Sequence, residues 1–395
     1  MSSTPNDSAD EVIVHVFGRT DVGRTREHNE DAFVVADLSA DNATLQPDVR
    51  THRSGTKGSL FMVADGMGGA AAGEIASAMA VDAVLGNLRS VWLTDSSTDP
   101  QTFVRAIKLA TKAANEQINA YAASHPEYRG MGTTATIAGL LGDTLYLAQV
   151  GDSRAYIVRD GVARQITKDQ SLMQKLIEAG ELTEEEAEHS ERRNIILQAL
   201  GPEPTIKVDL THQTVRRGDT LVLCSDGLSG QMTKDDIASI VSHEPDLTVA
   251  CKELIDRANA NGGPDNITVI LARFDGERLQ GPASEDHVGH KVFPLPETGQ
   301  TPAMSMDRII QSDTPTQPIP VAEPPRQSHP SKPVVSPPAP ERVSEPIVIV
   351  SPARRSTGRL IAVALLAVLV VGAVWFVIRT IRSTTAPVTS TTPSK

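Results

Sequence analysis

Apolar runs that end at a carboxylate beside glycine recur along this chain, and they constrain its fold more than any other feature. The pattern occurs in residues 63–69, 149–154 and 223–227. A further carboxylate at Asp265 comes just before an apolar run, and residues 26–31 form an acidic cluster upstream. A lone Asp-Gly pair usually marks only a turn. Five carboxylate-bearing segments, four of them next to apolar runs, predict instead that strand ends carry a shared acidic site.

The chemistry of that site follows from its ligand types. Carboxylates next to glycines, where the backbone can approach closely, suit hard cations. Magnesium or manganese prefers such oxygen ligands, with water completing an octahedron. No Cys/His set with zinc spacing is present in the sequence, which argues against a zinc site.

The part of the chain that carries these motifs mixes the periods of strands and helices. Its apolar runs predict strands at 60–64, 144–150, 155–158, 220–224 and 267–274, and a turn at Asp160-Gly161. Alanine-rich stretches with one apolar side predict helices at 71–88, 102–123 and 168–179.

Composition divides the chain into five regions. Residues 1–10 are polar and are expected to be disordered, whereas residues 11–274 have the composition of a globular domain. Residues 275–358 are rich in Pro, Ser and Thr and cannot bury enough apolar surface to offset their ordering entropy, so they are predicted to be a disordered linker. Residues 359–379 are predicted to form a transmembrane helix, and residues 380–395 a short external tail.

The membrane prediction rests on the nineteen residues from Leu360 to Ile378, none of which is charged. A helix of this length spans roughly the ~30 Å hydrocarbon core of a bilayer. Arginines flank it at 354, 355 and 359 on one side and at 379 and 382 on the other. The alternative, a buried core helix, is disfavoured because a Pro-rich stretch precedes the segment and no further domain follows to bury it.

Charge and cysteine content bear on location and partners. The 395-residue chain has a net charge of −12 and no basic patch, which argues against nucleic acid as its partner. Its two cysteines cannot build a disulfide framework, and its polar, acidic N-terminus does not resemble a signal peptide. We therefore expect a cell-membrane protein with a single span and a cytoplasmic catalytic domain.

The motifs together resemble the PP2C-like, or PPM, protein phosphatases over about residues 12–274, and the bacterial branch of that family in particular. The matching segments occur in the family's order and comprise residues 21–23, 26–31, 65–69, 132–134, 151–154, 225–228 and 263–266. The resemblance implies an α+β fold, an αββα sandwich of two antiparallel sheets flanked by helices. It also implies a variable flap at about residues 167–200, which influences substrate choice.

The resemblance further implies a role for each site residue. Asp65 would bridge two metal ions, with Asp226 and Asp265 on the first and the carbonyl group of Gly66 on one of them. Glu30 would bind the second ion, with Asp31 nearby, and Asp152 a third, looser one. Arg26 would bind the substrate phosphate. The implied catalytic residues are thus Arg26, Asp65 and Asp226, and the implied metal set is Glu30, Asp31, Asp65, Gly66, Asp152, Asp226 and Asp265.

The function expected from this resemblance is hydrolysis of phosphoserine and phosphothreonine in proteins. Two Mn²⁺ or Mg²⁺ ions would activate a water molecule, with a possible third ion. The expected partners are phosphorylated proteins, Ser/Thr kinases among them, and the membrane. One alternative is a pseudophosphatase that binds phosphoproteins without turnover, although the complete carboxylate set speaks against it. Another is a regulatory phosphatase with a single dedicated substrate.

Two further sequence features bear on mechanism. Met67 stands where animal members of the family have a histidine assigned as general acid, and methionine cannot donate a proton. Cys251 and Arg257 have the spacing of a cysteine-dependent phosphatase loop. The residues between them, Lys-Glu-Leu-Ile-Asp, have a helical pattern without glycine, which argues against such a loop.

Overall fold

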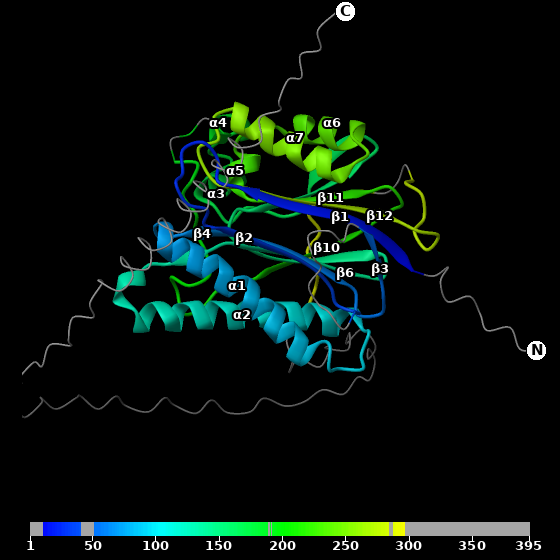
Figure 1. Ribbon diagram of the computed structural model, residues 1–395, viewed down its shortest axis with the longest axis horizontal. Helices are drawn as coiled ribbons and strands as arrows, with labels where there is room; N and C mark the ends of the chain where they lie inside the picture. Colours follow the sequence, from blue (N-terminus) through cyan, green and yellow to red (C-terminus); the bar gives the residue numbers. More distant parts are fainter. Residues whose placement is uncertain (1–10, 41–50, 189, 191, 284–286, 297–395) are drawn as a thin grey trace, which may run out of the picture. The chain divides into compact units, whose positions relative to one another are not determined.

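The computed structural model describes residues 11–40, 51–188, 190, 192–283 and 287–296. Two antiparallel sheets lie face to face in this part of the chain (Figure 1). The first sheet has the order β3 (Thr51–Ser54), β1 (Val12–Asp21), β12 (Ile267–Asp275), β11 (Thr220–Cys224), β8 (Arg154–Arg159) and β9 (Val162–Gln165). The second has the order β10 (Asp209–Thr214), β7 (Thr144–Val150), β6 (Ala135–Leu141), β4 (Ser59–Met67) and β2 (Asp31–Asp37), and the short β5 (Gly132–Thr133) also pairs with β4.

Helices cover the outer face of each sheet (Figure 1). The second sheet is covered by α1 (Ala70–Val91) and α2 (Pro100–Ser124), and a 3₁₀ turn, η2 (Pro126–Tyr128), follows them. The first sheet is covered by α6 (Lys234–His243) and α7 (Leu247–Ala260), with the short α5 (Asp226–Ser229) at its edge. The segment between β9 and β10 carries α3 (Leu172–Glu178) and α4 (Glu184–Glu188). The predicted αββα sandwich is therefore confirmed.

Alternation along the strands produces three apolar layers. In β4, Leu60, Met62 and Ala64 pack toward α1 and α2, whereas Phe61 and Val63 pack between the sheets. Successive side chains of a strand point to opposite faces, so a strand buried on both faces must be apolar throughout. The continuous apolar run at 60–64 meets that requirement, as does the run in β12, which divides in the same way between the inner layer and α7.

Local signals account for where the helices begin. The side chain of Asp99 accepts a hydrogen bond of 2.8 Å from the backbone N–H of Thr102, and Pro100 occupies the first position of α2. The helix predicted at 168–179 begins later, at Leu172, with Ser171 as its N-cap. The preceding residue, Gln170, lies outside the helix, and its backbone N–H donates to the carbonyl oxygen of Gly151. The other two predicted helices and the five predicted strands are confirmed.

The predicted end of the globular domain at residue 274 is wrong. The β12 strand continues to Asp275, and the chain then returns across the second sheet. Leu279 and Val288 are buried between the sheets, and the backbone N–H of Phe293 donates to the carbonyl oxygen of Leu210 in β10. We call residues 276–283 and 287–296 the strap. The strap carries enough apolar side chains to belong to the folded core rather than to a linker.

The other predicted regions fall outside the described residues. This applies to residues 1–10, to the linker from residue 297 onward, and to the transmembrane helix and tail at 359–379 and 380–395. Among the helices that the structure does describe, none has the length and apolar content needed to cross a bilayer.

Candidate functional site

The acidic motifs converge because antiparallel pairing brings their strand ends to one end of the sandwich. Asp31 at the start of β2 lies directly opposite Asp65 at the end of β4. In the other sheet, Asp21 at the end of β1 lies opposite Ile267, so Asp265 just before β12 lies at the same end. The β11 strand pairs its last residue with the first residue of β8, which places Asp226 and Asp152 there as well.

Asn266 holds the acidic loop before β2 against this end of the sheet. Its side-chain amide group donates to the carbonyl oxygens of Val22 and His28, at 3.0 and 2.9 Å. Its side-chain oxygen accepts a hydrogen bond of 2.8 Å from the backbone N–H of Glu30. A single buried amide therefore satisfies three backbone groups of the loop that carries Arg26 and Glu30.

Asp31 is fixed by one of its two carboxylate oxygens. Its Oδ2 accepts hydrogen bonds from the hydroxyl groups of Ser225, at 2.8 Å, and Thr268, at 2.6 Å. Its Oδ1 is buried and has no hydrogen-bond partner among the described residues. The same is true of Oδ1 of Asp152 and of Asp226. Buried carboxylate oxygens without a donor are costly, and they are the atoms that a hard cation would bind.

The described residues at this end of the sheets have the ligand types that suit a cation, but they do not form a complete coordination shell. Within the described ranges, no three His, Cys, Asp or Glu side chains are already placed to hold one metal ion. The donors at this end of the sheets are all oxygens, from Asp31, Asp65, Asp152, Asp226 and Asp265. An all-oxygen set suits Mg²⁺ or Mn²⁺.

Two close backbone approaches position Glu30 and Asp65. A Cβ atom at Gly66 would lie 2.2 Å from the carbonyl oxygen of Gly73, and one at Gly73 would lie 2.2 Å from Oε2 of Glu30. Glycine is therefore required where β4 crosses the first turn of α1. The backbone N–H of Asp65 donates to the hydroxyl oxygen of Thr134 at 2.9 Å, and its carbonyl oxygen accepts from the backbone N–H of Thr134 at 2.8 Å.

The electrostatics of the cluster favour the protonated carboxyl groups when no cation is bound. Burial raises the pKa of Asp31 to about 7, and burial together with the charge of Asp226 raises the pKa of Asp152 to about 7. Burial and the neighbouring carboxylates hold the pKa of Asp65 well above its usual range, and burial raises the pKa of Asp226 and of Glu30. Bringing positive charge to this site would relieve the repulsion among these groups.

Arg26 lies at the edge of the cluster and is accessible to solvent. Its Nη2 donates to Oδ2 of Asp265 at 2.8 Å, and 47% of its side chain is exposed. The ion pair orients the guanidinium group, and its other N–H groups have no hydrogen-bond partner among the described residues. Guanidinium groups in this setting match two oxygens of a phosphate group.

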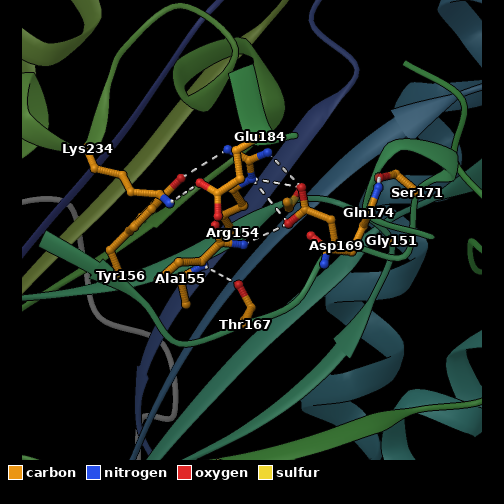
Figure 2. Close-up of polar contacts among 12 residues, drawn as sticks. Gly151, Arg154, Ala155, Tyr156, Thr167, Asp169, Ser171, Gln174, Glu184 and Lys234 are labelled. Atoms are coloured by element: carbon orange, nitrogen blue, oxygen red, sulfur yellow. Dashed lines mark hydrogen bonds and ion pairs between the residues drawn. The ribbon is translucent and has the colours of Figure 1, made fainter. Parts of the chain in front are cut away.

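A cavity of about 700 Å³ opens from the acidic cluster. Its lining includes Arg26, Asp152, Asp226 and Asp265 together with residues of the segment predicted as the flap. The flap is joined to β8 by Arg154, whose Nε and Nη2 both donate to the carboxylate of Asp169, with Nη2–Oδ2 at 2.7 Å (Figure 2).

Several residues of the site were not singled out from the sequence. Asn266, Ser225, Thr268 and Thr134 orient the acidic residues or the backbone beside them. Asn266, Ser225 and Thr134 stand inside the quoted motifs, so the signal for them was present, whereas Thr268 lies within an apolar strand and had none. The Arg154–Asp169 ion pair was missed because nothing local relates the two residues.

The structure places both Met67 and the Cys251/Arg257 pair, the two features that bear on mechanism. Met67 pairs with Gly132 of β5 beside the acidic cluster. Cys251 and Arg257 both lie in α7, and burial raises the pKa of the Cys251 thiol to about 12. A buried thiol on a helix is not a nucleophile, so the dismissal of a cysteine-dependent phosphatase loop is confirmed.

Comparison with known sequences identifies relatives of the described domain. Residues 39–271 match the family described as protein phosphatase 2C. The serine/threonine phosphatase stp of Listeria monocytogenes is 37% identical over 262 residues, which cover 66% of this chain and 96% of that protein. The serine/threonine protein phosphatase PstP of Mycobacterium tuberculosis is 33% identical over 314 residues, covering 78% of this chain and 55% of that protein.

Solved structures agree with these matches. The structure of the S. agalactiae serine/threonine phosphatase matches with a TM-score of 0.58 and 34% identity, covering 66% of this chain and 99% of that one. The catalytic domain of the serine/threonine protein phosphatase PstP, determined in complex with two manganese ions, has a TM-score of 0.54 and 33% identity, covering 67% of this chain and 99% of that one.

Proposed function

This chain belongs to the protein phosphatase 2C family, and on that premise we propose that it hydrolyses phosphoserine and phosphothreonine in proteins with the help of Mn²⁺ or Mg²⁺. One observation carries the proposal. The acidic segments meet at one end of the sandwich, where three carboxylates each keep a buried oxygen that has no donor in the described part of the chain, and where a cavity reaches the surface. Bound cations would offset the repulsion among these carboxylates, and they would also attract the negatively charged phosphate group of a substrate.

The residues divide into those that would hold the cations and those that would hold the substrate. Asp65, Asp226, Asp265 and the carbonyl group of Gly66 form the first group. Glu30, Asp31 and Asp152 extend it, with Asp152 available for a third ion. When bound, such ions supply charge neutralisation for the phosphoryl group and lower the pKa of a coordinated water molecule.

Arg26 would orient the phosphate group. Its pairing with Asp265 fixes the guanidinium plane beside the acidic cluster, and its exposure leaves room for a ligand. A fixed cation at this point stabilises the charge that develops on the equatorial oxygens during transfer. Asp265 therefore contributes in two ways, as a carboxylate of the cluster and as the residue that positions Arg26.

Met67 changes the route by which a proton reaches the leaving group. A thioether has no proton to donate, and no other side chain is assigned to this step. We infer that water in the open cavity protonates the leaving alkoxide. This step matters more for serine and threonine than for aryl leaving groups, which are better stabilised as anions.

The cellular setting belongs to the same proposal. The relatives are serine/threonine phosphatases by name, and phosphoproteins that include membrane Ser/Thr kinases are the proposed substrates. The uncharged segment at 360–378 supports anchoring of the chain to the cell membrane.

Manganese-dependent hydrolysis of a phosphothreonine peptide by the full-length chain tests the activity. We expect phosphate release with MnCl₂ and none with excess chelator. Asp226→Asn should lower kcat by roughly 100-fold or more, because it removes charge from the cation site. Asp82→Asn makes the same change on the exposed face of α1 and should have no effect. Binding of the phosphopeptide without any release of phosphate would show a pseudophosphatase instead.

A further inference from the structure

The cavity at the acidic cluster is lined by apolar as well as polar and charged side chains. The apolar ones include Met173 and Ile177 of α3, Ala187 of α4, and Met232 just before α6. We call these four residues the apolar subsite. Met173 and Met232 are each only 6% exposed and Ala187 5%, so the apolar surface that they present to the cavity is small and largely shielded from solvent.

The cavity lining also carries charged groups beyond the acidic cluster. Arg154 donates to Asp169. Lys234 Nζ lies 3.4 Å from Oε2 of Glu184 and so joins α6 to α4 (Figure 2). The formal charges of these four residues cancel. Arg193 of the flap lines the cavity as well, and it too has an interaction partner.

We propose that the apolar subsite receives an uncharged apolar side chain of the substrate polypeptide, one that flanks the phosphorylated residue. The inference rests on the proposed phosphatase function. Its support is continuity, because the apolar subsite and the acidic residues Asp152, Asp226 and Asp265 line one cavity. A chain whose phosphate group reaches Arg26 can place a neighbouring side chain in the same space.

The physical chemistry of the lining selects for apolar groups. Two methionines offer a flexible, polarizable surface that adapts to side chains of different shape. The volume of about 700 Å³ is in the usual range for ligand sites, roughly 300–1,000 Å³. A charged side chain placed against the apolar subsite would lose hydration, and the charged groups of the Arg154–Asp169 and Lys234–Glu184 pairs already have partners. Leu, Ile or Met is therefore the expected occupant.

A panel of phosphothreonine peptides tests the preference with the full-length chain and Mn²⁺. Each position from four residues before to four residues after the phosphothreonine is changed in turn to Leu, Ala, Glu or Lys. We expect one position at which Leu raises kcat/KM roughly 10-fold over Ala, the usual size of apolar discrimination. Glu and Lys at that position should be no better than Ala.

Two variants connect the preference to the named residues. Ile177→Ala and Met232→Ala should each reduce the Leu-to-Ala ratio of kcat/KM toward 1. The ratio is taken within one enzyme, so a change in overall activity does not affect it. Ile177 is partly exposed, so its variant should fold even if the Met232 variant does not. Leu109→Ala, on the exposed surface of α2 at 53% exposure, should keep the full ratio.

The outcomes separate this inference from the proposed function. Hydrolysis of all peptides at equal rates, or an unchanged ratio in the Ile177 and Met232 variants, would overturn the apolar subsite and leave the phosphatase activity in place. Failure to hydrolyse any phosphopeptide or aryl phosphate would overturn both. If a segment of the same chain or a second copy filled the cavity instead, Ile177→Ala would speed hydrolysis of every peptide alike, and the inference would again be wrong.

Discussion

The two carboxylate oxygens of Asp31 lie in different surroundings, and the difference determines what the residue can do. Oδ2 accepts two hydroxyl hydrogen bonds, whereas Oδ1 is buried without a donor among the described residues. The hydroxyl groups lower the pKa of Asp31, but burial outweighs them and raises it to about 7. A cation beside Oδ1 would reverse the balance and favour the ionised form.

The first prediction concerns the pH dependence of the metal-free protein. The folded state keeps a proton on Asp31 up to a pH of about 7, whereas the unfolded state releases it near 4. The unfolded state therefore binds fewer protons in this window, and the free energy of unfolding falls as the pH rises from about 4 to about 7. Asp31→Asn should reduce this fall by up to about 4 kcal/mol, since a difference of one pKa unit corresponds to about 1.4 kcal/mol.

Denaturant unfolding at pH 5 and pH 8 in the presence of chelator measures the effect. Asp82→Asn, which changes an exposed carboxylate on α1, serves as the matched control and should follow the wild-type protein. Adding MnCl₂ at pH 8 should stabilise the wild-type protein more than Asp31→Asn. Parallel pH curves for the two proteins would show that burial of Asp31 does not control stability.

At the scale of elements, the strap shows how a segment outside the sheets completes them. Its backbone pairs with the edge strand β10, since Thr211 and Val292 form a bridge and the N–H of His212 donates to Lys291. The ring of Phe293 packs against Tyr146 of β7 with 5.4 Å between ring centroids. An unpaired edge strand invites association with other chains, and the strap covers part of this edge.

The second prediction tests whether the strap belongs to the core. Leu279 is 1% exposed between the sheets, whereas Val292 is 67% exposed on the same segment. Leu279→Ala should destabilise the protein by about 2–4 kcal/mol, because it leaves a cavity in the inner layer. Val292→Ala should change the free energy of unfolding by less than about 0.5 kcal/mol.

Urea unfolding of the two variants gives the comparison. A similar, small effect of both substitutions would mean that the strap contributes little to the stability of the fold. A large effect of Leu279→Ala alone would also show that ending the chain near residue 274 removes a side chain on which the stability of the inner layer depends.

At the scale of the whole molecule, the chain is longer than the family domain that it contains. The match to the family covers residues 39–271 of 395, and the apolar segment at 360–378 lies well beyond it and outside the described residues. The membrane helix therefore stays a prediction from the sequence. Three arginines precede the segment and two follow it, and an excess of positive charge is typical of the cytoplasmic side.

The third prediction concerns this topology. We expect the chain to fractionate with membranes, with residues 11–296 on the cytoplasmic side. Protease added to sealed spheroplasts should leave this domain intact and should cleave it once detergent opens the membrane. Replacing Ala364 and Val368 with Asp should release the protein from membranes, because two charges near the centre of the span oppose insertion. Cleavage of the domain while the membrane is sealed would contradict the orientation.

Much of the fold and the chemical character of the site could be predicted from the sequence. The period-2 and period-3.6 patterns are local, and they placed five strands and two long helices correctly. The motifs next to those strands resemble one family in both their residues and their order, and they contain Asp65, Asp152, Asp226 and Asp265. Such information is readable because side-chain direction repeats regularly along a strand or a helix.

Only the tertiary structure decided which of these groups meet and what holds them. The hydrogen bond from Glu30 to Asn266 joins residues 236 positions apart, and the one from Ser225 to Asp31 joins residues 194 positions apart. The strap lies in a stretch whose composition predicts a linker, yet Leu279 and Val288 fill the inner layer. Contacts of this kind depend on the packing of whole sheets rather than on neighbouring residues, so no local pattern in the sequence records them.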